Sequence, residues 1–520
     1  MKKLLGKMAI LGLSATIALT SVGCGQIGGL DDAGENVVQM YVWESGYGIE
    51  WINELVEEYN AMADNPYSVE LYSSTNMTTV TSTLSSGADV NPYDLYITGL
   101  GSFIGTVPDM EDLSTVLDST KYATNGETIR SKYDAQLIES RTYNGKFLGF
   151  NLGSSPSGIF YNAQMFDTYG LKVPNTSEEL RKLVIRIGAD SRMKTDEGEQ
   201  VAPFAHFKDA NNGYWKYIYE PWVAQAMGTE AFGKLILLED AQGNKDQKAV
   251  YLGNKETDAR YQVIKELGKF LNANNVHKSS NSLGHTNMQT LFVSGEAAMM
   301  VNGAWIKNEV ASSGQSVANF KIMKTPVFSG IINRLNSIAN DEELSKVVAA
   351  ADAGKTLEQA KVDVPALTQA DYDEVILARG MTYGAIGDAG QIVFVPNYSG
   401  SKDAAKDFLS YIYSDAGAQA WMDALHTDFA IELVDKSLVD TTGWDAFDKS
   451  MNEFGASTFS TGGGLNSSKV YVDNGKDIFA NVNIIMNLTL SSGAKTVDEI
   501  WDDMQTSINN GWDLWIGSNN

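Results

Sequence analysis

The first hundred residues alternate between short apolar runs and segments in which apolar residues recur at helical spacing. Val37 to Trp43 is an apolar, β-prone run, and a loop with two glycines follows it. Between residues 50 and 59 the apolar side chains share one helical face, with glutamates at the other positions; they are Trp51, Ile52, Leu55, Val56 and Tyr59. A strand, a glycine-containing loop and an amphipathic helix form one βα unit. The pattern therefore predicts an α/β fold that opens as a doubly wound sheet.

The alternation continues along the chain, but a segment rich in Gly, Pro and Ser interrupts it. Residues 153–158 read GSSPSG and separate two runs of strands and helices, which is typical of a connection between lobes. Thr176 and Glu179 have the spacing of a capping box, as have Thr496 and Glu499, so a helix should start at each place. A chain of 520 residues is too long for one hydrophobic core, because single cores stop growing at ~250 to 300 residues. We therefore expect two lobes.

Leu291 to Asn308 reads LFVSGEAAMMVNGAWIKN and places an aromatic residue directly after a buried strand. Gly295 has the position of a residue that ends a helix, and Ala297 to Val301 is an uncharged run of strand length. The run stops at Asn302 and Gly303, and Trp305 follows. Open α/β sheets bind ligands at the carboxyl ends of their strands, so Trp305 is a candidate ligand contact. The alternative is that Trp305 is a core residue beneath the next helix.

The segment GEAAMMVNGAW, residues 295–305, resembles the hallmark segment of the extracellular solute-binding proteins of carbohydrate ABC importers. The similarity is to family 1, the maltose-binding-protein-like branch. Tyr161 to Pro174 also resembles the place where members of this family first cross from one lobe to the other. The resemblance implies a two-lobe periplasmic-binding-protein-like fold of type II, with hinge crossovers and a helical insertion. It also implies that the ring of Trp305 stacks on a sugar.

The resemblance and the sequence pattern together give expected domain boundaries. We expect a signal peptide at 1–23, a linker at 24–36, the N-lobe at 37–152 and 326–426, and the C-lobe at 153–325 and 427–520. The second N-lobe segment would contain the helical insertion, at about residues 330–367.

The first 24 residues have the pattern of an export signal. Three lysines precede an uncharged run from Met8 to Gly23, which is short for a membrane span. Cys24 is the only cysteine of the chain and stands directly after Ser21-Val22-Gly23, which resembles a bacterial lipobox, although Ser21 replaces the usual Leu. The pattern predicts a palmitate-type lipid on Cys24 and anchoring at the extracellular face of the cytoplasmic membrane. The alternative is a chance free cysteine.

Composition and motifs exclude several classes of function. The chain is 43% hydrophobic and 20% charged, as soluble globular proteins are, and its formal net charge of −26 disfavours nucleic acid and anionic membrane surfaces as partners. It has no Gly-x-Ser-x-Gly elbow and no Walker phosphate loop, and its four histidines lack metal-site spacing. Asp240 to Asp246 alternates oxygen ligands but lacks the spacing of a calcium loop. We therefore expect no catalytic residue, metal or cofactor.

Polar and aromatic residues at the predicted strand ends form the candidate ligand site. The resemblance places side chains of the first loop and of the aromatic segment 214–222 beside the ligand. The candidates are Trp43, Glu44, Tyr47, Asn76, Trp215, Tyr219, Asn302, Trp305 and Tyr383. Aromatic density this high is also typical of a buried helix, so some rings of segment 214–222 must be core.

The sequence therefore predicts a receptor that closes two lobes over an oligosaccharide and delivers it to the permease subunits of an ABC transporter. Several predicted site edges carry an aromatic ring, which favours an oligosaccharide over a monosaccharide. We expect a monomer. The alternative is a lipid-anchored glycoside hydrolase, in which two carboxylates ~5 to 9.5 Å apart would suffice for catalysis.

Overall fold

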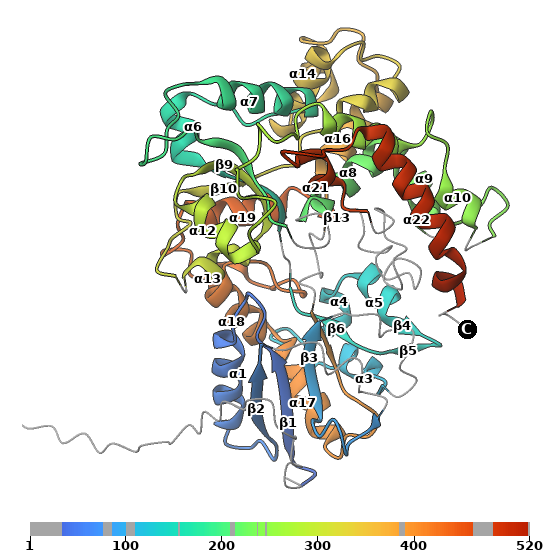
Figure 1. Ribbon diagram of the computed structural model, residues 1–520. Helices are drawn as coiled ribbons and strands as arrows, with labels where there is room; N and C mark the ends of the chain where they lie inside the picture. The colour runs from blue at the N-terminus through green and yellow to red at the C-terminus, as the bar shows by residue number, and fades with distance from the viewer. Residues whose placement is uncertain are drawn as a thin grey trace, which may run out of the picture.

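A computed structural model shows two lobes, each built around its own sheet (Figure 1). The structure describes residues 34–75, 86–99, 110–153, 156–208, 214–236, 238–244, 247–311, 313–383, 391–460 and 482–517. Cys24, Asn76, the predicted signal peptide and most of the predicted linker lie outside these residues.

The N-lobe contains a five-stranded mixed sheet in the order β2-β1-β3-β12-β6. Its strands are β1 (Val37–Trp43), β2 (Ser68–Ser74), β3 (Leu95–Gly99), β6 (Phe150–Asn151) and β12 (Gln391–Phe394). β1 runs parallel to β2 and β3, whereas β12 runs antiparallel to β3 and β6. The main helices that contribute to the core of this lobe are α1 (Glu50–Asn60), α3 (Ser114–Leu117), α17 (Lys402–Ile412) and α18 (Asp415–Leu425), and two short helices add Ile129 and Leu137 to it.

Helix α1 forms as the apolar spacing predicts. All five predicted apolar residues, from Trp51 to Tyr59, are buried in the N-lobe core. Trp51 meets Trp421 of α18 edge to face, with ring centroids 5.0 Å apart. The first βα unit is therefore confirmed, and it places the loop after β1 at one end of the sheet.

The C-lobe contains a four-stranded sheet in the order β10-β7-β9-β8. Its strands are β7 (Ser157–Asn162), β8 (Ala202–Ala205), β9 (Ala297–Gly303) and β10 (Phe320–Met323). All seven residues of β9 are buried, as its uncharged sequence predicts. The surrounding helices are α6 (Ala163–Tyr169), α7 (Ser177–Ala189), α8 (Lys216–Met227), α11 (Ala259–Gly268), α12 (His285–Val293), α13 (Ile306–Ala311), α19 (Ala446–Ala456) and α22 (Val497–Gly517).

A helical insertion packs on the C-lobe, although its sequence position predicts the N-lobe. It comprises η4 (Ser329–Arg334), α14 (Asp341–Asp352), α15 (Leu357–Ala360) and α16 (Gln369–Gly380). Hydrogen bonds join it to α7 and α8: Thr176 Oγ1 donates to Asp341, and Arg334 Nε donates to the carbonyl of Gln225. The expected boundary at 326 therefore does not mark a change of lobe, because the chain stays on the C-lobe until after Thr382.

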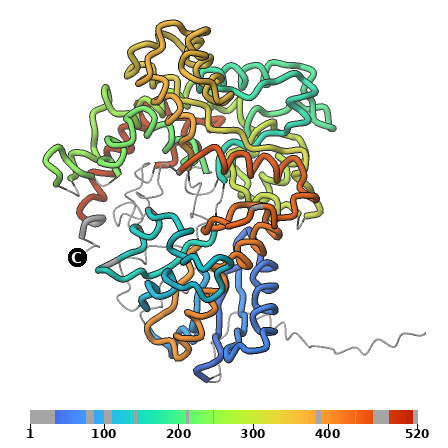
Figure 2. Tube along the Cα trace, turned by 180° about the vertical axis from the view of Figure 1, so that it is seen from behind, coloured from blue at the N-terminus to red at the C-terminus, as the bar shows by residue number. Residues whose placement is uncertain are grey.

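The described residues place three passages of the chain between the lobes. It leaves the N-lobe sheet after β6 and enters the C-lobe sheet at β7, where the sequence predicts a connection. It returns between residues 383 and 391, and β12 then pairs with β3. The last crossing follows Trp444, whose ring is in the N-lobe core, whereas Phe447 is in the C-lobe core. Figure 2 shows the result, with chain from near residue 400 (orange) beside the first strands and α1 (blue).

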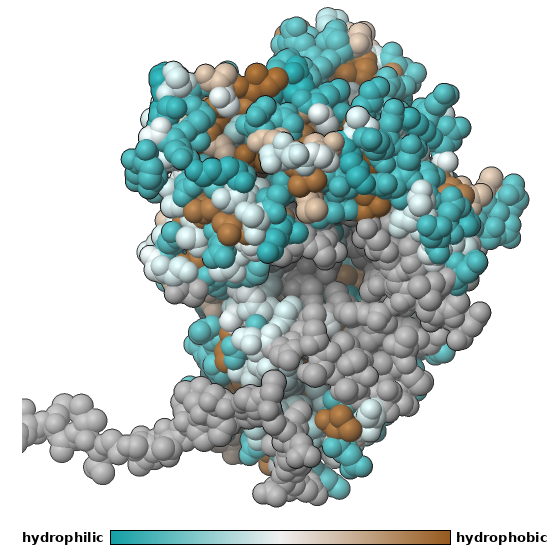
Figure 3. Space-filling model, viewed as in Figure 1, coloured by the Kyte–Doolittle hydropathy of each residue, from teal (hydrophilic) through white to brown (hydrophobic). Residues whose placement is uncertain are grey.

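The remaining elements are short. They are α4 (Ile129–Lys132), α5 (Ala135–Arg141), β4 (Thr142–Tyr143), β5 (Lys146–Phe147), α9 (Thr229–Ile236), α10 (Lys248–Leu252), β11 (Met381–Thr382), η5 (Lys436–Leu438), β13 (Phe459–Ser460) and α21 (Ile484–Thr489). Within the described ranges, no helix combines the length and the apolar character that crossing a membrane requires. On the face drawn in Figure 3, hydrophilic residues cover most of the coloured surface and hydrophobic ones are scattered.

Candidate functional site

Trp305 lies where the two lobes meet. β9 ends at Gly303, a two-residue turn follows, and the helix α13 begins at Ile306. The indole is only partly buried and packs against the hydrophobic cores of both lobes. In Figure 1, α13 is the part of the C-lobe next to α18 of the N-lobe. Trp305 is therefore a junction residue and not a residue inside one core.

Aromatic rings from both lobes surround Trp305. Tyr214 and Tyr217 of the C-lobe meet it at near-right angles, with ring centroids 5.5 and 6.3 Å away. Tyr47 of the N-lobe does the same at 6.4 Å. Tyr383 lies 4.8 Å from Tyr217. We call Tyr47, Tyr214, Tyr217, Trp305 and Tyr383 the aromatic cluster.

Two glycines allow the indole of Trp305 to sit where it does. A Cβ atom on Gly303 would lie 2.2 Å from Cζ3 of the indole. A Cβ atom on Gly46 would lie 2.7 Å from Cβ of Trp305 and 3.2 Å from a carboxylate oxygen of Glu309. Gly303 belongs to β9 and Gly46 to the loop after β1, so each lobe leaves space for the same side chain. Gly303 thus sets the position of the indole, and Gly46 lets the N-lobe loop approach it.

Polar groups border the aromatic cluster. Asn308 Nδ2 donates to the backbone carbonyl of Tyr47 at 3.3 Å, which links α13 to the N-lobe loop. The neighbouring Glu309 accepts a hydrogen bond from Gln289 Nε2 at 2.6 Å and lies 3.4 Å from His285 Nε2. Lys216 Nζ lies 4.8 Å from the ring centroid of Tyr383. The arrangement can offer ring faces and hydrogen-bonding groups to the same ligand.

Trp43 and Glu44 lie at the carboxyl end of β1, as predicted, and both are partly exposed. Trp43 Nε1 donates to the carbonyl of Thr75 at 3.3 Å, and Ser73 Oγ donates to Glu44. Gln391 Nε2 donates to the carbonyl of Trp43 at 3.0 Å, so β12 fixes this strand end. Trp43 and Glu44 precede Tyr47 by a few residues. Tyr47 contacts the ring of Trp305, whereas no ring contact between Trp43 and Trp305 is among those described.

Three other candidate residues, Asn302, Trp215 and Tyr219, are buried. Asn302 is fully buried, and its Oδ1 accepts the N–H of Gly303 at 2.8 Å. Trp215 and Tyr219 are also fully buried; Trp215 meets Phe204 edge to face, and the hydroxyl of Tyr219 donates to the carbonyl of Arg260 at 3.3 Å. These two rings lie in the core of the C-lobe and not in the aromatic cluster.

The neighbours Tyr214 and Tyr217 occupy the place expected for Trp215 and Tyr219. Tyr214 precedes α8 and has a left-handed backbone conformation with a φ of 66°, so it does not continue the helix. Tyr214 and Tyr217 stack on each other with centroids 5.1 Å apart. The sequence carries no signal for this pair, because Tyr214 precedes the helix and its positive φ sets the direction of its ring. Trp215 and Tyr219, four apart, share the face that the core covers.

A polar cluster joins the lobes two residues after Trp305. Lys307 of α13 donates to Asp448 of α19, and His426 Nδ1, at the end of α18, lies 2.7 Å from the same carboxylate. The ring of His426 stacks on Trp444, with centroids 5.3 Å apart. Burial opposes ionisation of Asp448, but the hydrogen bonds from His426 and Lys307 outweigh it and keep the pKa of this carboxyl below its usual value.

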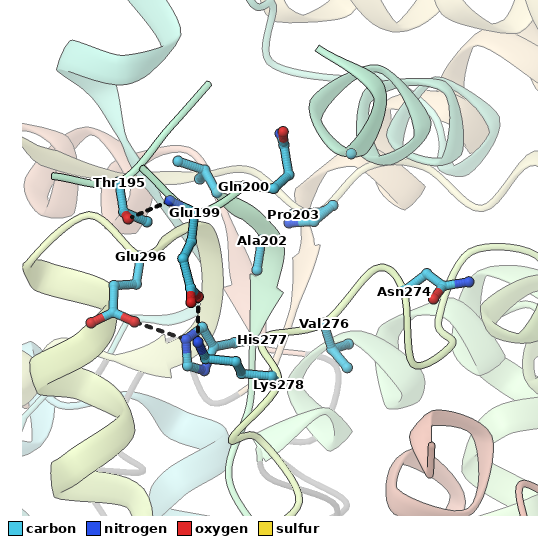
Figure 4. A pocket seen from close by; sticks show the side chains of 12 residues that line it. Thr195, Glu199, Gln200, Ala202, Pro203, Asn274, Val276, His277, Lys278 and Glu296 are labelled. Carbon is cyan, nitrogen blue, oxygen red and sulfur yellow. Dashed lines mark hydrogen bonds and ion pairs between the residues drawn. The ribbon is translucent and has the colours of Figure 1, made fainter. Parts of the chain in front are cut away.

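A separate pocket of about 160 Å³ opens beside β8, the edge strand of the C-lobe sheet (Figure 4). His277 Nε2 lies 2.9 Å from Glu296 in this pocket, and Lys278 donates to Glu199. The charged groups that Figure 4 draws are thus paired with one another. In the part of the chain that the structure describes, no three His, Cys, Asp or Glu side chains are grouped to hold a metal ion.

The sequence profile of the bacterial extracellular solute-binding proteins matches residues 45–419 of the chain. This range includes all five residues of the aromatic cluster. The chain belongs to the bacterial extracellular solute-binding proteins. It is therefore a solute receptor and not an enzyme. No curated protein matches the chain in sequence.

Solved structures share the fold of this solute-binding protein. The bacterial solute receptor AcbH, described as preferring β-D-galactopyranose, aligns with a TM-score of 0.59 and 14% identity over 92% of this chain and 99% of its own. A chitin oligosaccharide binding protein gives 0.59 and 14% over the same shares. Maltose-bound MalE3 of T. maritima gives 0.57 and 12% over 91% and 99%. These likenesses confirm the two-lobe α/β fold of the periplasmic binding proteins.

Proposed function

We propose that this protein is the carbohydrate receptor of an ABC importer and that it binds an oligosaccharide between its lobes. The observation that carries the proposal is the position of Trp305, whose ring contacts come from both lobes. Structures of the same fold are described with galactopyranose, chitin oligosaccharide and maltose, which supports a saccharide as the solute. Family membership leaves the glycoside hydrolase alternative without support.

The mechanism we propose is closure of the lobes around the saccharide. Trp305 and Tyr214 keep part of their surface exposed, whereas Tyr47, Tyr217 and Tyr383 are buried around them. Aromatic faces cover the apolar C–H surface of a sugar, and side-chain amides and carboxylates bond its hydroxyl groups. Closure brings Tyr47 of the N-lobe against Trp305 of the C-lobe, so a ligand in contact with both rings favours the closed state.

Several parts of the proposal concern the receptor's surroundings. We propose that the closed form delivers its ligand to permease subunits and that the receptor acts as a monomer. Cys24 would carry the lipid that holds it at the extracellular face of the membrane.

Trp43, Glu44 and Asn76 would contribute to the N-lobe side of the site, and Asn302 would shape the turn that presents Trp305. A panel of starch, mannan and plant-fibre oligosaccharides is the first ligand screen, because a ligand bound by the native state raises the melting temperature of the protein.

Replacement of Trp305 by Ala tests the proposal directly. Truncating a central aromatic anchor should cost about 2 kcal/mol of binding free energy, or roughly thirtyfold in affinity, measured by calorimetry with the best oligosaccharide of the screen. Tyr261→Ala is the matched control, because the ring of Tyr261 packs against Trp501 of α22 and not against the aromatic cluster among the contacts described, so this variant should bind as the wild type does. Unchanged affinity in a folded Trp305→Ala protein would place the site elsewhere.

A further inference from the structure

Lys216 brings a positive charge to the aromatic cluster. Its Nζ lies 4.8 Å from the ring centroid of Tyr383 and 5.8 Å from that of Tyr217. The side chain begins α8 and is only partly buried. Tyr217 contacts both Tyr383 and Trp305, so a single ring separates the ammonium from the indole.

The charge of Lys216 has no carboxylate partner within the described residues. Some other lysines of this acidic chain do have one, such as Lys307, which bonds to Asp448, and Lys278, which bonds to Glu199. The carboxylate of Glu309, beside the cluster, accepts from Gln289. In a chain with a formal net charge of −26, a cation left without an acid at the junction of the lobes is available to a ligand.

We infer that the saccharide bound at the aromatic cluster carries a carboxylate, as uronic-acid-containing oligosaccharides do. This inference rests on the proposed function. A neutral sugar offers only hydroxyl groups to an ammonium, whereas a carboxylate forms a shorter and stronger charge-assisted hydrogen bond. The rings take the apolar face of the sugar, and Lys216 takes the acid. Lys216 then determines specificity without being needed for stacking.

Calorimetry with matched acidic and neutral ligands tests the inference. Trigalacturonate and its fully methyl-esterified form share one backbone and differ in charge; a glucuronic-acid-substituted xylotriose and xylotetraose form a second pair. The proteins are the full chain, Lys216→Gln, Lys216→Arg, and the control Lys172→Gln, which removes an exposed lysine far along the sequence from the cluster. Each titration is run at low and high salt, because screening weakens ion pairs more than stacking.

We expect the acidic member of at least one pair to bind tenfold or more tightly than its neutral partner, and the preference to fall at high salt. Lys216→Gln should lose the preference, and Lys216→Arg and Lys172→Gln should retain it. Neutral ligands that bind as well as acidic ones would overturn the inference and leave the proposed function standing. An acidic preference that survives in Lys216→Gln would also overturn it. A folded protein that binds neither kind of saccharide would contradict both.

Discussion

At the scale of single residues, Gly303 controls where the indole of Trp305 can lie. A methyl group on Gly303 would overlap the six-membered ring of Trp305, since its Cβ would be 2.2 Å from Cζ3. We expect Gly303→Ala to displace the indole and to lower affinity for the saccharide about as much as Trp305→Ala. Overpacking should also cost ~1 to 3 kcal/mol of stability. Calorimetry and thermal unfolding measure the two effects separately.

Gly400→Ala is the control, because no atom lies within 4 Å of the Cβ that it would add. Wild-type affinity in Gly303→Ala would show that the position of the indole does not matter for binding. A loss of affinity in both variants would point to a general effect of the substitutions.

Single site residues were predictable from the sequence where a buried strand ends at a glycine. Trp305 follows a buried strand and a glycine, and it lies at the predicted strand end. Trp215 and Tyr219 were not predictable in this way, because an aromatic-rich helix does not reveal which of its faces the core covers. The positive φ of Tyr214 turns that ring toward Trp305, and no residue pattern indicates this turn.

At the scale of elements, caps and strand ends were predictable but packing partners were not. Thr496 and Glu499 bond reciprocally, with Glu499 accepting the N–H of Thr496 at 2.8 Å and Thr496 accepting that of Glu499 at 3.3 Å. Such signals are local, so the sequence contains them. The insertion packs on the C-lobe through contacts such as Thr176 with Asp341, which join residues 165 positions apart. No local pattern encodes such a contact.

The contact between α13, α18 and α19 yields a prediction with a definite pH dependence. The pKa of Asp448 is lowered in the folded state, so its ion pairs contribute stability above the pKa of the unfolded carboxyl. That contribution is lost as the pH falls through the folded pKa. Asp448→Asn should therefore destabilise the protein by about 2 kcal/mol at pH 7, since hydrogen bonds to charged groups contribute about that much. The difference from wild type should shrink toward pH 3.

Urea unfolding at pH 7 and at pH 3 measures the difference. Asp423→Asn removes an exposed carboxylate of α18 and should change stability little at either pH. A penalty for Asp448→Asn that stays the same at both pH values would mean that the charge of Asp448 is not what stabilises the junction.

At the scale of the whole molecule, the two-lobe architecture was predictable because chain length, the GSSPSG segment and two α/β runs all point to it. The angle between the lobes was not, because it depends on contacts that the lobes make only with each other. Tyr47 with Trp305 and Asn308 with the carbonyl of Tyr47 are such contacts. A change at this junction should alter closure without altering the fold of either lobe.

Gly46→Leu tests this expectation. A side chain on Gly46 would project against Cβ of Trp305, 2.7 Å from its own Cβ, and toward Glu309, so the lobes could not approach as they do here. We expect small-angle scattering to show a larger radius of gyration than for wild type in the presence of ligand, with weaker binding, because less of the closed form is available to the ligand. Gly443→Leu adds the same side chain where no atom lies within 4 Å and should close normally. Equal radii of gyration and equal affinities for Gly46→Leu and wild type would show that contact between the N-lobe loop and α13 is not part of closure.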